Sequence, residues 1–378
     1  MNPPGSTELA QRLATEIAAA GGAIPFARFM ERALYEPDLG YYERDRRVVG
    51  KRGDFYTSVS VGPLFGELLA FQFADWLSAL PGAAESAVRF QLVEAGAHDG
   101  RLARDILSFL SQWQPELAVR LDYWIVEPSP ARQAWQRETL AAFGDQVRWF
   151  GAVDELPPVR GVILSNELLD AFPVHRLGWD AARHRWFEWG VGAEGQTFRW
   201  CRLAERTVPA PELPAELLAV LPDGFTTEVC PAAEAWWRRA AGRLAAGRLF
   251  TADYGLEAPE FFLPQRANGT LRAYARHRFA EDVLAEPGTQ DLTAHVNFSA
   301  LQAAGEAVGL TTEVFTRQRR FLTDILAVTQ RPGARFPAWD SPRVRQFQTL
   351  THPEHLGRAF AVLTQERRPA ERAFSAAS

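Results

Sequence analysis

The sequence predicts an α/β fold whose core is a parallel, doubly wound sheet. Short apolar runs alternate with helical patterns through the middle of the chain. Polar residues, several of them acidic, directly follow these runs, as at Glu94, Glu127 and Asn166. Parallel strands need a helix between them, and their carboxyl ends meet at one edge of the sheet, where ligands bind. We therefore expect a ligand site at that edge.

Three helices and a long polar loop precede the predicted sheet. Apolar residues at helical spacing predict helices over residues 7–20, 25–34 and 61–80. Residues 35–60 are too polar for a core element and too aromatic for a plain linker. This segment is typical of a functional loop.

The sheet itself is predicted from apolar runs that alternate with helices. The turn at residues 94–100 leads into a helix that begins near Leu102, and residues 131–143 form the next predicted helix. The predicted strands of the sheet cover residues 88–93, 121–126, 147–150, 159–164 and 247–252.

Further elements are inserted into this core and follow it. Residues 174–227 alternate and are rich in Trp, which predicts a small antiparallel insertion. The C-terminal part is expected to hold a helix over residues 298–308, a strand over 311–316, and a helical tail over 321–326 and 347–363.

Composition limits the possible functions. The chain has 378 residues, 47% hydrophobic and 23% charged, so it can bury a sizeable core in two or three structural units. Its net charge of -5 argues against a general affinity for nucleic acid or anionic membranes. Cys201 and Cys230 lack metal-ligand spacing, so we expect no metal site and no disulfide framework. Neither a signal peptide nor a membrane-spanning run is visible, so we expect a cytoplasmic protein.

The turn Glu94-Ala95-Gly96-Ala97-His98-Asp99-Gly100 is the first candidate cofactor site. Glycines between a strand and a helix let the backbone approach a ligand, and the helix N-terminus supplies N–H donors. Glu94 would repel a pyrophosphate but attract the cationic sulfonium and ammonium groups of S-adenosylmethionine. The pattern therefore favours S-adenosylmethionine over a dinucleotide, although a simple strand-to-helix turn remains the alternative.

Two other strand ends carry candidate site residues. Glu127 can accept hydrogen bonds from both ribose hydroxyls of a nucleotide, or it can cap the next helix. Asn166 and Glu167 would stand beside the transferring methyl group, where Glu167 could hold a guanidinium through two hydrogen bonds. In the alternative, Asn166 and Asp170 cap the next helix and Glu167 is solvated.

A loop between the N-terminal helices and the sheet offers a carboxylate, hydroxyls and an aromatic face. This combination suits the methionine end of the cofactor and a lid. It could equally be a capped helix start before Val61. The candidate cofactor-binding residues of this loop are Gly53, Asp54, Phe55, Thr57 and Ser58.

Taken in order, these motifs resemble the MidA-like family of methyltransferases, which includes a mitochondrial complex I assembly factor that methylates a protein arginine. The resemblance runs over nearly the whole chain. The segments that carry it are residues 35–37, 40–42, 53–58, 65–67, 94–100, 105–107, 126–129, 166–174, 253–255, 269–272 and 291–298.

The resemblance implies a Rossmann-like methyltransferase core with an N-terminal helical subdomain, inserted β and helical elements, and S-adenosyl-L-methionine as cofactor. Residues 1–85 would form the helical part and cofactor loop. Residues 86–255 would form the core, with the insertion at about 175–228, and residues 256–378 would complete the core and the acceptor cleft.

The residue roles follow from the same comparison. Asn166 and Glu167 are the expected catalytic residues, and a protein side chain, by resemblance an arginine nitrogen, is the expected methyl acceptor. The expected cofactor-binding residues outside the loop are Glu94, Gly96, Ala97, Gly100, Glu127 and Asn166.

One departure lies in the turn, where the family usually reads E-L-G-P-G-R-G. Here His98 replaces the middle glycine and Asp99 replaces the arginine. If that position needs a positive φ, the replacement costs on the order of 1 kcal/mol in strain. A binding or assembly protein with weak or lost catalysis is therefore the alternative hypothesis. An NAD-dependent oxidoreductase is a weaker one, because the G-x-G-x-x-G pattern is missing.

Overall fold

The chain folds into two compact units that interleave along the sequence. The structure, a computed structural model, describes residues 4–43, 57–195, 197–275, 278–353 and 356–368. Unit 1 comprises residues 1–56, 167–234 and 254–300, and unit 2 comprises residues 57–166, 235–253 and 301–378. The predicted segments 1–85, 86–255 and 256–378 are continuous in the sequence, whereas the two units group residues by their contacts in space. The two divisions therefore cannot be compared boundary by boundary.

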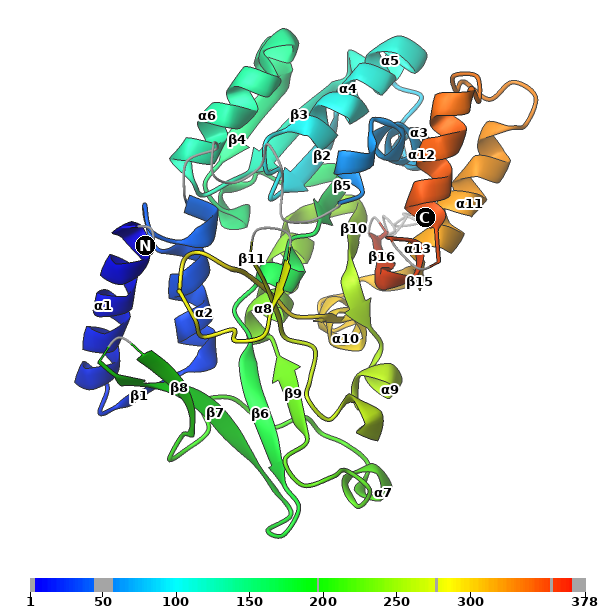
Figure 1. The fold of residues 1–378 in the computed structure, drawn as a ribbon. Helices are drawn as coiled ribbons and strands as arrows, with labels where there is room; N and C mark the ends of the chain where they lie inside the picture. The colour runs from blue at the N-terminus through cyan, green and yellow to red at the C-terminus, as the bar shows by residue number, and fades with distance from the viewer. Residues whose placement is uncertain (1–3, 44–56, 196, 276–277, 354–355, 369–378) are drawn as a thin grey trace, which may run out of the picture. The chain divides into compact units, whose positions relative to one another are not determined.

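Unit 2 contains the predicted sheet, which confirms the α/β fold class (Figure 1). Its strands follow the order β15-β16-β10-β5-β2-β3-β4. The pairs among β2, β3, β4, β5 and β10 that have a described register are parallel, and β15 pairs antiparallel with β16. The strands are β2 (Phe90–Ala95), β3 (Leu121–Val126), β4 (Val147–Phe150), β5 (Val159–Asn166), β10 (Leu244–Leu256), β15 (Thr311–Arg317) and β16 (Phe360–Arg367).

Helices connect these strands and cover the sheet. Phe73 of α3 and Phe321 of α11 both pack on Phe250 of β10, with ring centroids 5.6 and 5.7 Å apart. Burial of such aromatic side chains supplies most of the stabilisation of this layer. The helices of the unit, of which α8 and α10 begin in unit 1, are α3 (Leu64–Ser78), α4 (Arg101–Trp113), α5 (Pro115–Ala118), α6 (Pro130–Thr139), α8 (Pro231–Arg243), α10 (Phe298–Glu306), α11 (Gln318–Thr329), α12 (Ser341–Thr351) and α13 (Leu356–Ala359).

The predicted helical tail over residues 347–363 is wrong at its end, although residues 356–359 form the short helix α13. Helix α12 ends at Thr351, and residues 360–363 lie in strand β16. The segment from Phe360 to Gln365 is buried at every position, and a continuously buried strand cannot be told from a buried helix by periodicity. Helix α8, which the sequence analysis did not predict, has Trp237 donating to Gln365 of β16 at 2.7 Å.

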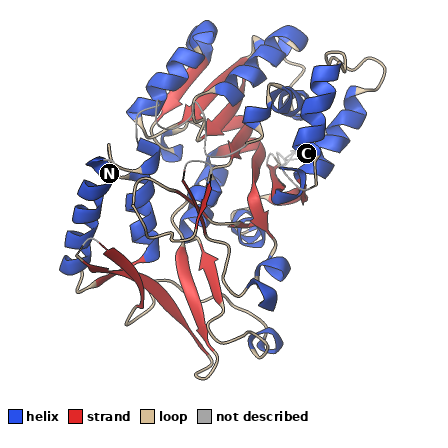
Figure 2. Ribbon diagram, viewed as in Figure 1, coloured by secondary structure: helices blue, strands red, loops and turns tan. Residues whose placement is uncertain are grey.

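Unit 1 is built on an antiparallel sheet of order β1-β7-β6-β9, with β8 paired to β7. The alternating, Trp-rich pattern of residues 174–227 corresponds to β6, β7, β8 and β9. Figure 2 shows these strands together with the helices of the unit. The elements of this part are α1 (Pro4–Ala19), β1 (Ala23–Pro25), α2 (Phe26–Tyr35), β6 (His175–Asp180), β7 (Arg185–Glu194), β8 (Thr197–Arg202), α7 (Ala215–Leu218) and β9 (Thr226–Val229).

A second, three-stranded sheet of order β12-β11-β13 completes unit 1. One apolar core joins α1, α2 and this sheet, since Leu13, Phe29 and Leu292 are all buried in it. Strand β14 pairs in parallel with the end of β10. The remaining elements are α9 (Ala258–Phe261), β11 (Arg272–Ala275), β12 (Arg278–Ala280), β13 (Asp291–Thr293) and β14 (Val296–Asn297).

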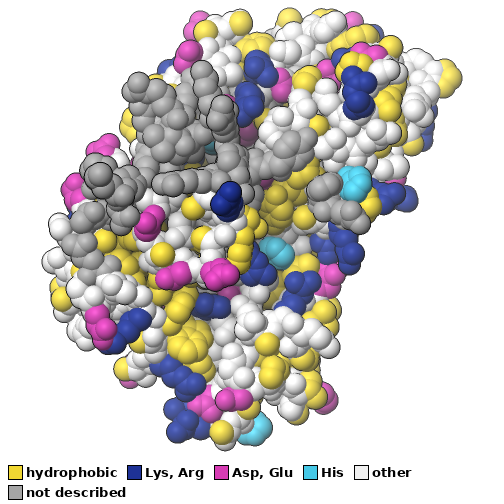
Figure 3. Space-filling model, viewed as in Figure 1, with side chains coloured by type: hydrophobic (Ala, Val, Ile, Leu, Met, Phe, Trp, Pro, Cys, Tyr) yellow, Lys and Arg dark blue, Asp and Glu magenta, His cyan; other side chains and the backbone are white. Residues whose placement is uncertain are grey.

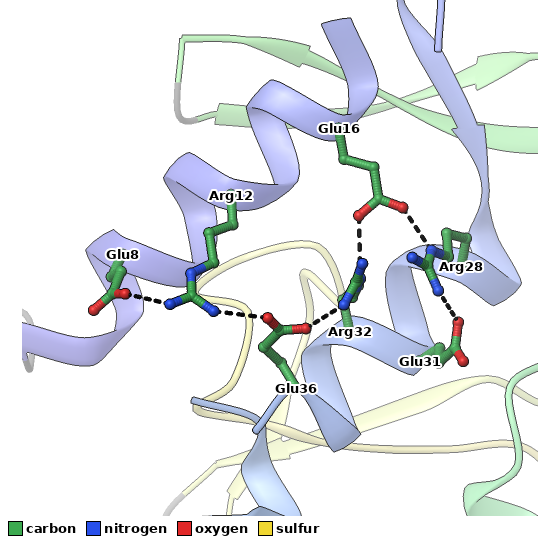
Figure 4. Close-up of polar contacts among 7 residues, drawn as sticks. All are labelled: Glu8, Arg12, Glu16, Arg28, Glu31, Arg32 and Glu36. Carbon is green, nitrogen blue, oxygen red and sulfur yellow. Dashed lines mark hydrogen bonds and ion pairs between the residues drawn. The ribbon is translucent and has the colours of Figure 1, made fainter. Parts of the chain in front are cut away.

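Ion pairs join the solvent-facing sides of α1 and α2 (Figure 4). Glu36 accepts from Arg12 at 2.8 Å and from Arg32 at 2.5 Å, and Glu16 accepts from Arg28 and Arg32 at 2.5 and 3.1 Å. The side chain of Glu36 is only 9% exposed, whereas its partners Arg12 and Arg32 are 52% and 33% exposed. Because solvent reaches the arginines, we expect each pair to add little to stability and mainly to fix how α1 and α2 align.

The surface of the described residues carries both signs of charge. Arg and acidic side chains are interspersed on the face that Figure 3 shows. No helix among the described residues is long and apolar enough to span a membrane.

Candidate functional site

The carboxyl ends of three neighbouring strands in unit 2 bring predicted site residues to one level of the sheet. Ala95 of β2 pairs with Val126 of β3 and with Ser165 of β5, so the next residues are Gly96, Glu127 and Asn166. The amide of Gly96 also donates to the carbonyl of Val126 at 3.2 Å. Because adjacent strands lie roughly 4.8 Å apart, these residues line a short stretch of one edge of the sheet.

The glycine turn has the backbone conformation that its sequence predicts. Gly96 and Gly100 have φ angles of 73° and 82°, a region that residues with a Cβ rarely adopt. Gly100 is the N-cap of α4, so the first N–H groups of that helix begin at the turn. Ala97 is buried between these glycines. The turn therefore places glycine backbone without a Cβ directly after β2, where a ligand can approach it closely, as a nucleotide-type cofactor requires.

His98 occupies a position that does require a positive φ. Its φ is 47°, in the left-handed region, so the imidazole-bearing residue carries the expected strain of about 1 kcal/mol. The side chain is 42% exposed. The carbonyl of His98 accepts from Gln136 at 3.0 Å. The departure from the family pattern is thus accommodated, with an exposed ring and a backbone held from α6.

Glu94, at the end of β2, is a buried carboxylate with a phenol donor. Tyr123 of β3 donates to its Oε2 at 2.6 Å. Burial raises the pKa of Glu94 to about 7; the Tyr123 hydrogen bond opposes that rise, and the charges of Asp99 and Asp105 add to it. Ionisation of Glu94 is therefore costly in the free protein and would be favoured by a cation bound beside it.

Asp99 in the same turn behaves in the opposite way. Burial acts to raise its pKa, but the hydrogen bond and charge of His98, together with Arg101, hold the pKa of this carboxyl well below its usual range. Arg101 Nε lies 2.8 Å from its Oδ2. Asp99 therefore adds a fixed negative charge near Glu94, which favours a cationic ligand there.

Glu127 is buried and held by nitrogen donors. Its Oε1 accepts from the amide of Ser129 at 3.0 Å and its Oε2 accepts from Gln136 at 3.1 Å. The Ser129 contact agrees in part with the alternative that Glu127 organises the start of the next helix, since Ser129 is the N-cap of α6. The two bonds fix the plane of the carboxylate, which is what an acceptor of a ribose diol needs.

Asn166 and Glu167 stand at the end of β5. Asn166 pairs with Ala252 of β10. Glu167 is the first residue of the second segment of unit 1, and its φ angle is 51°. The short helical turn that follows has Leu168 as its N-cap, with no side-chain cap bond, so the alternative role of Asn166 as its cap is not what the structure shows. A left-handed non-glycine residue after a core strand is typical of functional sites.

The predicted cofactor loop is described only at its end. Gly53, Asp54 and Phe55 lie outside the described residues. The Oγ1 of Thr57 accepts from the amide of Ser60 at 3.1 Å, which agrees with the alternative of a capped helical start. Ser58 is buried and donates to Gln318 of α11 at 3.2 Å, so the described partner of this hydroxyl is not in the glycine turn. The cofactor roles of all five residues stay predictions.

Sequence reasoning missed two residues that complete this edge of the sheet, Tyr123 and Gln136. Glu94 pairs with Ile125 of β3, and Tyr123 lies two residues before Ile125. The side chains of Tyr123 and Glu94 are therefore on the same face of the sheet, which the sequence could have predicted had the strand register been known. Gln136 lies in a helix rich in polar residues, and no local pattern distinguishes it from the solvent-facing ones.

The arrangement fits S-adenosylmethionine. It combines a turn of bare backbone, a buried carboxylate with amide donors, and a second carboxylate whose ionisation a cation would favour. A pyrophosphate would meet the negative charges of Glu94 and Asp99, so the geometry agrees with the preference drawn from the sequence.

Comparisons with known proteins give the family. A family model described as "Putative S-adenosyl-L-methionine-dependent methyltransferase" matches residues 68–316. The mitochondrial protein arginine methyltransferase NDUFAF7 of Bos taurus is 30% identical over 378 residues, which cover 90% of this chain and 80% of that protein. Its Rattus norvegicus counterpart is 29% identical over 381 residues, covering 92% and 82%.

A solved structure agrees. A Burkholderia thailandensis protein crystallised with S-adenosyl-homocysteine is 36% identical, with a TM-score of 0.80 that covers 97% of this chain and 95% of the other. The predicted MidA-like resemblance and the predicted cofactor are therefore confirmed. The chain belongs to the MidA-like family of S-adenosyl-L-methionine-dependent methyltransferases.

Proposed function

We propose that this protein transfers a methyl group to an arginine nitrogen of a protein substrate. The observation that carries the proposal is Asn166, which ends β5 one position after the Ser165 partner of Ala95, together with the left-handed conformation of Glu167, the next residue in the chain. Relatives at 28–30% identity that are named protein arginine methyltransferases support the choice of acceptor.

The cofactor half of the site would be formed by unit 2. In this proposal Glu127 accepts the ribose hydroxyls, while the backbone of Gly96, Ala97 and Gly100 surrounds the rest of the nucleoside. Glu94 attracts the cationic end of the cofactor. When bound, S-adenosylmethionine supplies an electrophilic methyl group on its sulfonium sulfur.

The acceptor half depends on alignment. Glu167 accepts two N–H bonds from the guanidinium, and Asn166 orients the same group, so that one nitrogen lone pair points at the methyl carbon. A new N–C bond forms as the S–C bond breaks, and the proton released from that nitrogen passes to a carboxylate or to water. Glu167 is within reach of that role because it holds the nitrogen that loses the proton.

Buried acids elsewhere in unit 1 support a cationic acceptor. Asp170 and Asp291 are 5% and 6% exposed, and Asp291 accepts from the hydroxyl of Tyr42 at 2.7 Å. Burial, followed by the charges of Asp291 and then of Asp170, raises the pKa of Tyr42 well above its usual range. Asp170 is thus a buried acid three residues after Glu167, and a guanidinium bound there would compensate negative charge.

The test is a methyl-transfer assay with labelled cofactor. The protein is incubated with S-adenosyl-[methyl-³H]methionine and a cell extract that supplies the substrate proteins. The extract comes from cells that express the Glu127→Ala variant. The labelled proteins are then hydrolysed to amino acids. We expect label in methylarginine, and we expect the Glu167→Gln variant to bind cofactor while transferring at least about 100-fold more slowly. Label in methyl-lysine, or in small molecules alone, would contradict the arginine assignment.

The second candidate is a binding or assembly protein with little turnover. The observation behind it is His98, a strained residue where the family has glycine. Cofactor binding without transfer to any protein would favour it. Recovery of transfer in His98→Gly would assign the loss of catalysis to that single position.

A further inference from the structure

Gln136 of α6 links two parts of the proposed nucleoside site. Its side chain is fully buried. The Nε2 atom donates to the backbone carbonyl of His98 at 3.0 Å and to the Oε2 of Glu127 at 3.1 Å. An amide nitrogen carries two hydrogens, so these two bonds use both donors.

The other end of the amide is fixed as well. Its Oε1 accepts from the indole Nε1 of Trp149, on β4, at 2.9 Å. Turning the amide over would set its oxygen against the Glu127 carboxylate and its N–H groups against the indole N–H. The buried amide nitrogen thus has two acceptors and the amide oxygen has one donor, so the network allows a single orientation of the side chain.

The backbone of α6 also lies against the turn. A Cβ added to Gly100 would come within 3.4 Å of the Cα of Gln136 and of a methyl carbon of Leu140. The start of α4 and the middle of α6 are therefore in close contact, and the Gln136 side chain spans a short, packed gap rather than a flexible one.

We propose that Gln136 is a positioning residue for the cofactor, which holds the Glu127 carboxylate and the His98 carbonyl in a fixed relation to each other. It sets the spacing between the acid that accepts the ribose and the turn that receives the nucleoside. This inference rests on the proposed role of Glu127. It adds a specific requirement, since a hydrogen-bond donor is needed at residue 136 for cofactor binding.

The chain offers a matched control on the same helix. Gln133 donates to the backbone carbonyl of Glu127 at 2.8 Å but does not bond its carboxylate in the described contacts. Gln136→Met and Gln133→Met each remove one amide and keep a similar volume. We expect Gln136→Met to raise the Kd for S-adenosyl-homocysteine at least about tenfold, measured by calorimetry, and Gln133→Met to change it less than about threefold.

A second variant gives a readout that loss of packing cannot produce. Gln136→Glu sets a carboxyl against Glu127, so one of the two acids retains a proton to higher pH, and the protonated form can again donate a hydrogen bond. Other ionisable groups also lie on the elements that pack on residue 136. They are His98 and Asp99 in the turn, Arg101, Arg104 and Asp105 on α4, Arg132, Arg137 and Glu138 on α6, and Arg148 on β4.

The quantity to measure is the ratio of variant to wild-type Kd for S-adenosyl-homocysteine from pH 8 to pH 5.5. Dividing by the wild-type value removes the titration of Glu94 and of the other shared groups. We expect the ratio for Gln136→Glu to fall at least about fivefold as the pH is lowered. The same ratio for Gln133→Glu should stay nearly constant.

The outcomes separate this inference from the function beneath it. If Glu127→Ala binds S-adenosyl-homocysteine like the wild type, the proposed nucleoside site is wrong. If Glu127→Ala loses binding while Gln136→Met keeps wild-type affinity, only the role of Gln136 is overturned. If Gln136→Met shows no cooperative thermal transition, the pH series of Gln136→Glu tests the inference instead. A ratio of variant to wild-type Kd that does not change with pH would then overturn it.

Discussion

The ends of β2 and β3 each carry a buried glutamate, but the two are held differently. Glu94 has a phenol as its hydrogen-bond donor, and burial raises its pKa to about 7. Glu127 accepts from a backbone amide and from the amide of Gln136. Both residues end neighbouring parallel strands, so their environments differ through their partners rather than through their place in the fold.

The difference teaches how one edge of a sheet can serve two parts of one ligand. A carboxylate held by two nitrogen donors keeps a fixed plane, which suits recognition of a diol. A carboxyl group whose pKa is close to the ambient pH can lose its proton and become charged when a cation binds beside it, which suits a sulfonium or an ammonium group. The four predictions below test this contrast between a rigid acceptor and a titratable one.

Removing the rigid acceptor has the largest expected effect. Glu127→Ala should weaken binding of S-adenosyl-homocysteine about 100-fold. The variant loses the two hydrogen bonds that the ribose hydroxyls would donate to the carboxylate, which together are worth about 3 kcal/mol. Titration calorimetry measures the change. Adenosine should lose affinity by a similar factor, and an unchanged Kd for adenosine would place the ribose elsewhere.

Neutralising the titratable acid should stabilise the free protein at high pH. The folded pKa of Glu94 is raised from 4.5 to about 7, so its stabilising proton is fully present below about pH 4.5 and is lost as the pH rises through about 7. Glu94→Gln should therefore be up to about 3 kcal/mol more stable than the wild type at pH 8 and equal to it at pH 4. Chemical unfolding at both pH values measures this.

The same variant should bind the cofactor more weakly at pH 8, because the attracting charge is gone. Glu116→Gln is the control, since Glu116 is 84% exposed and should show neither effect. A Glu94→Gln protein that gains no stability at pH 8 would show that the acid is ionised there at little cost.

Removing the phenol donor should shift the titration of Glu94 rather than abolish binding. In Tyr123→Phe the opposing hydrogen bond is lost, and the pKa of Glu94 should rise further above about 7. At pH 7 the affinity for S-adenosylmethionine should fall about fivefold, and by pH 9 it should recover. A loss that is the same at both pH values would point to a packing defect instead.

Relieving the strained turn has the smallest expected effect. His98→Gly should raise stability by about 1 kcal/mol, or about 2 °C in Tm, because glycine adopts a φ of 47° without a Cβ clash. His184 has the same φ in unit 1, so His184→Gly is a matched control. We expect both to gain stability and only His98→Gly to change cofactor affinity, measured by thermal shift with and without ligand.

The sequence by itself determined the parallel strands and the residues at their ends. Apolar runs such as residues 121–126 are long enough for a strand and too short for a helix, and the polar residue that follows each one marks its carboxyl end. The glycines of the turn at residues 94–100 indicated positive φ angles, since other residues rarely adopt such angles. These local rules were sufficient to place Gly96, Glu127 and Asn166 together.

Only the tertiary structure decided what surrounds those residues. Residues 360–363 became a strand because β15 pairs with them, a contact between segments about 50 positions apart that local periodicity does not encode. Gln136 and Tyr123 became partners of Glu127 and Glu94 for the same reason, since a polar side chain is buried only where distant groups satisfy it. The sequence therefore specified where the site is, and packing specified how its two acids are held.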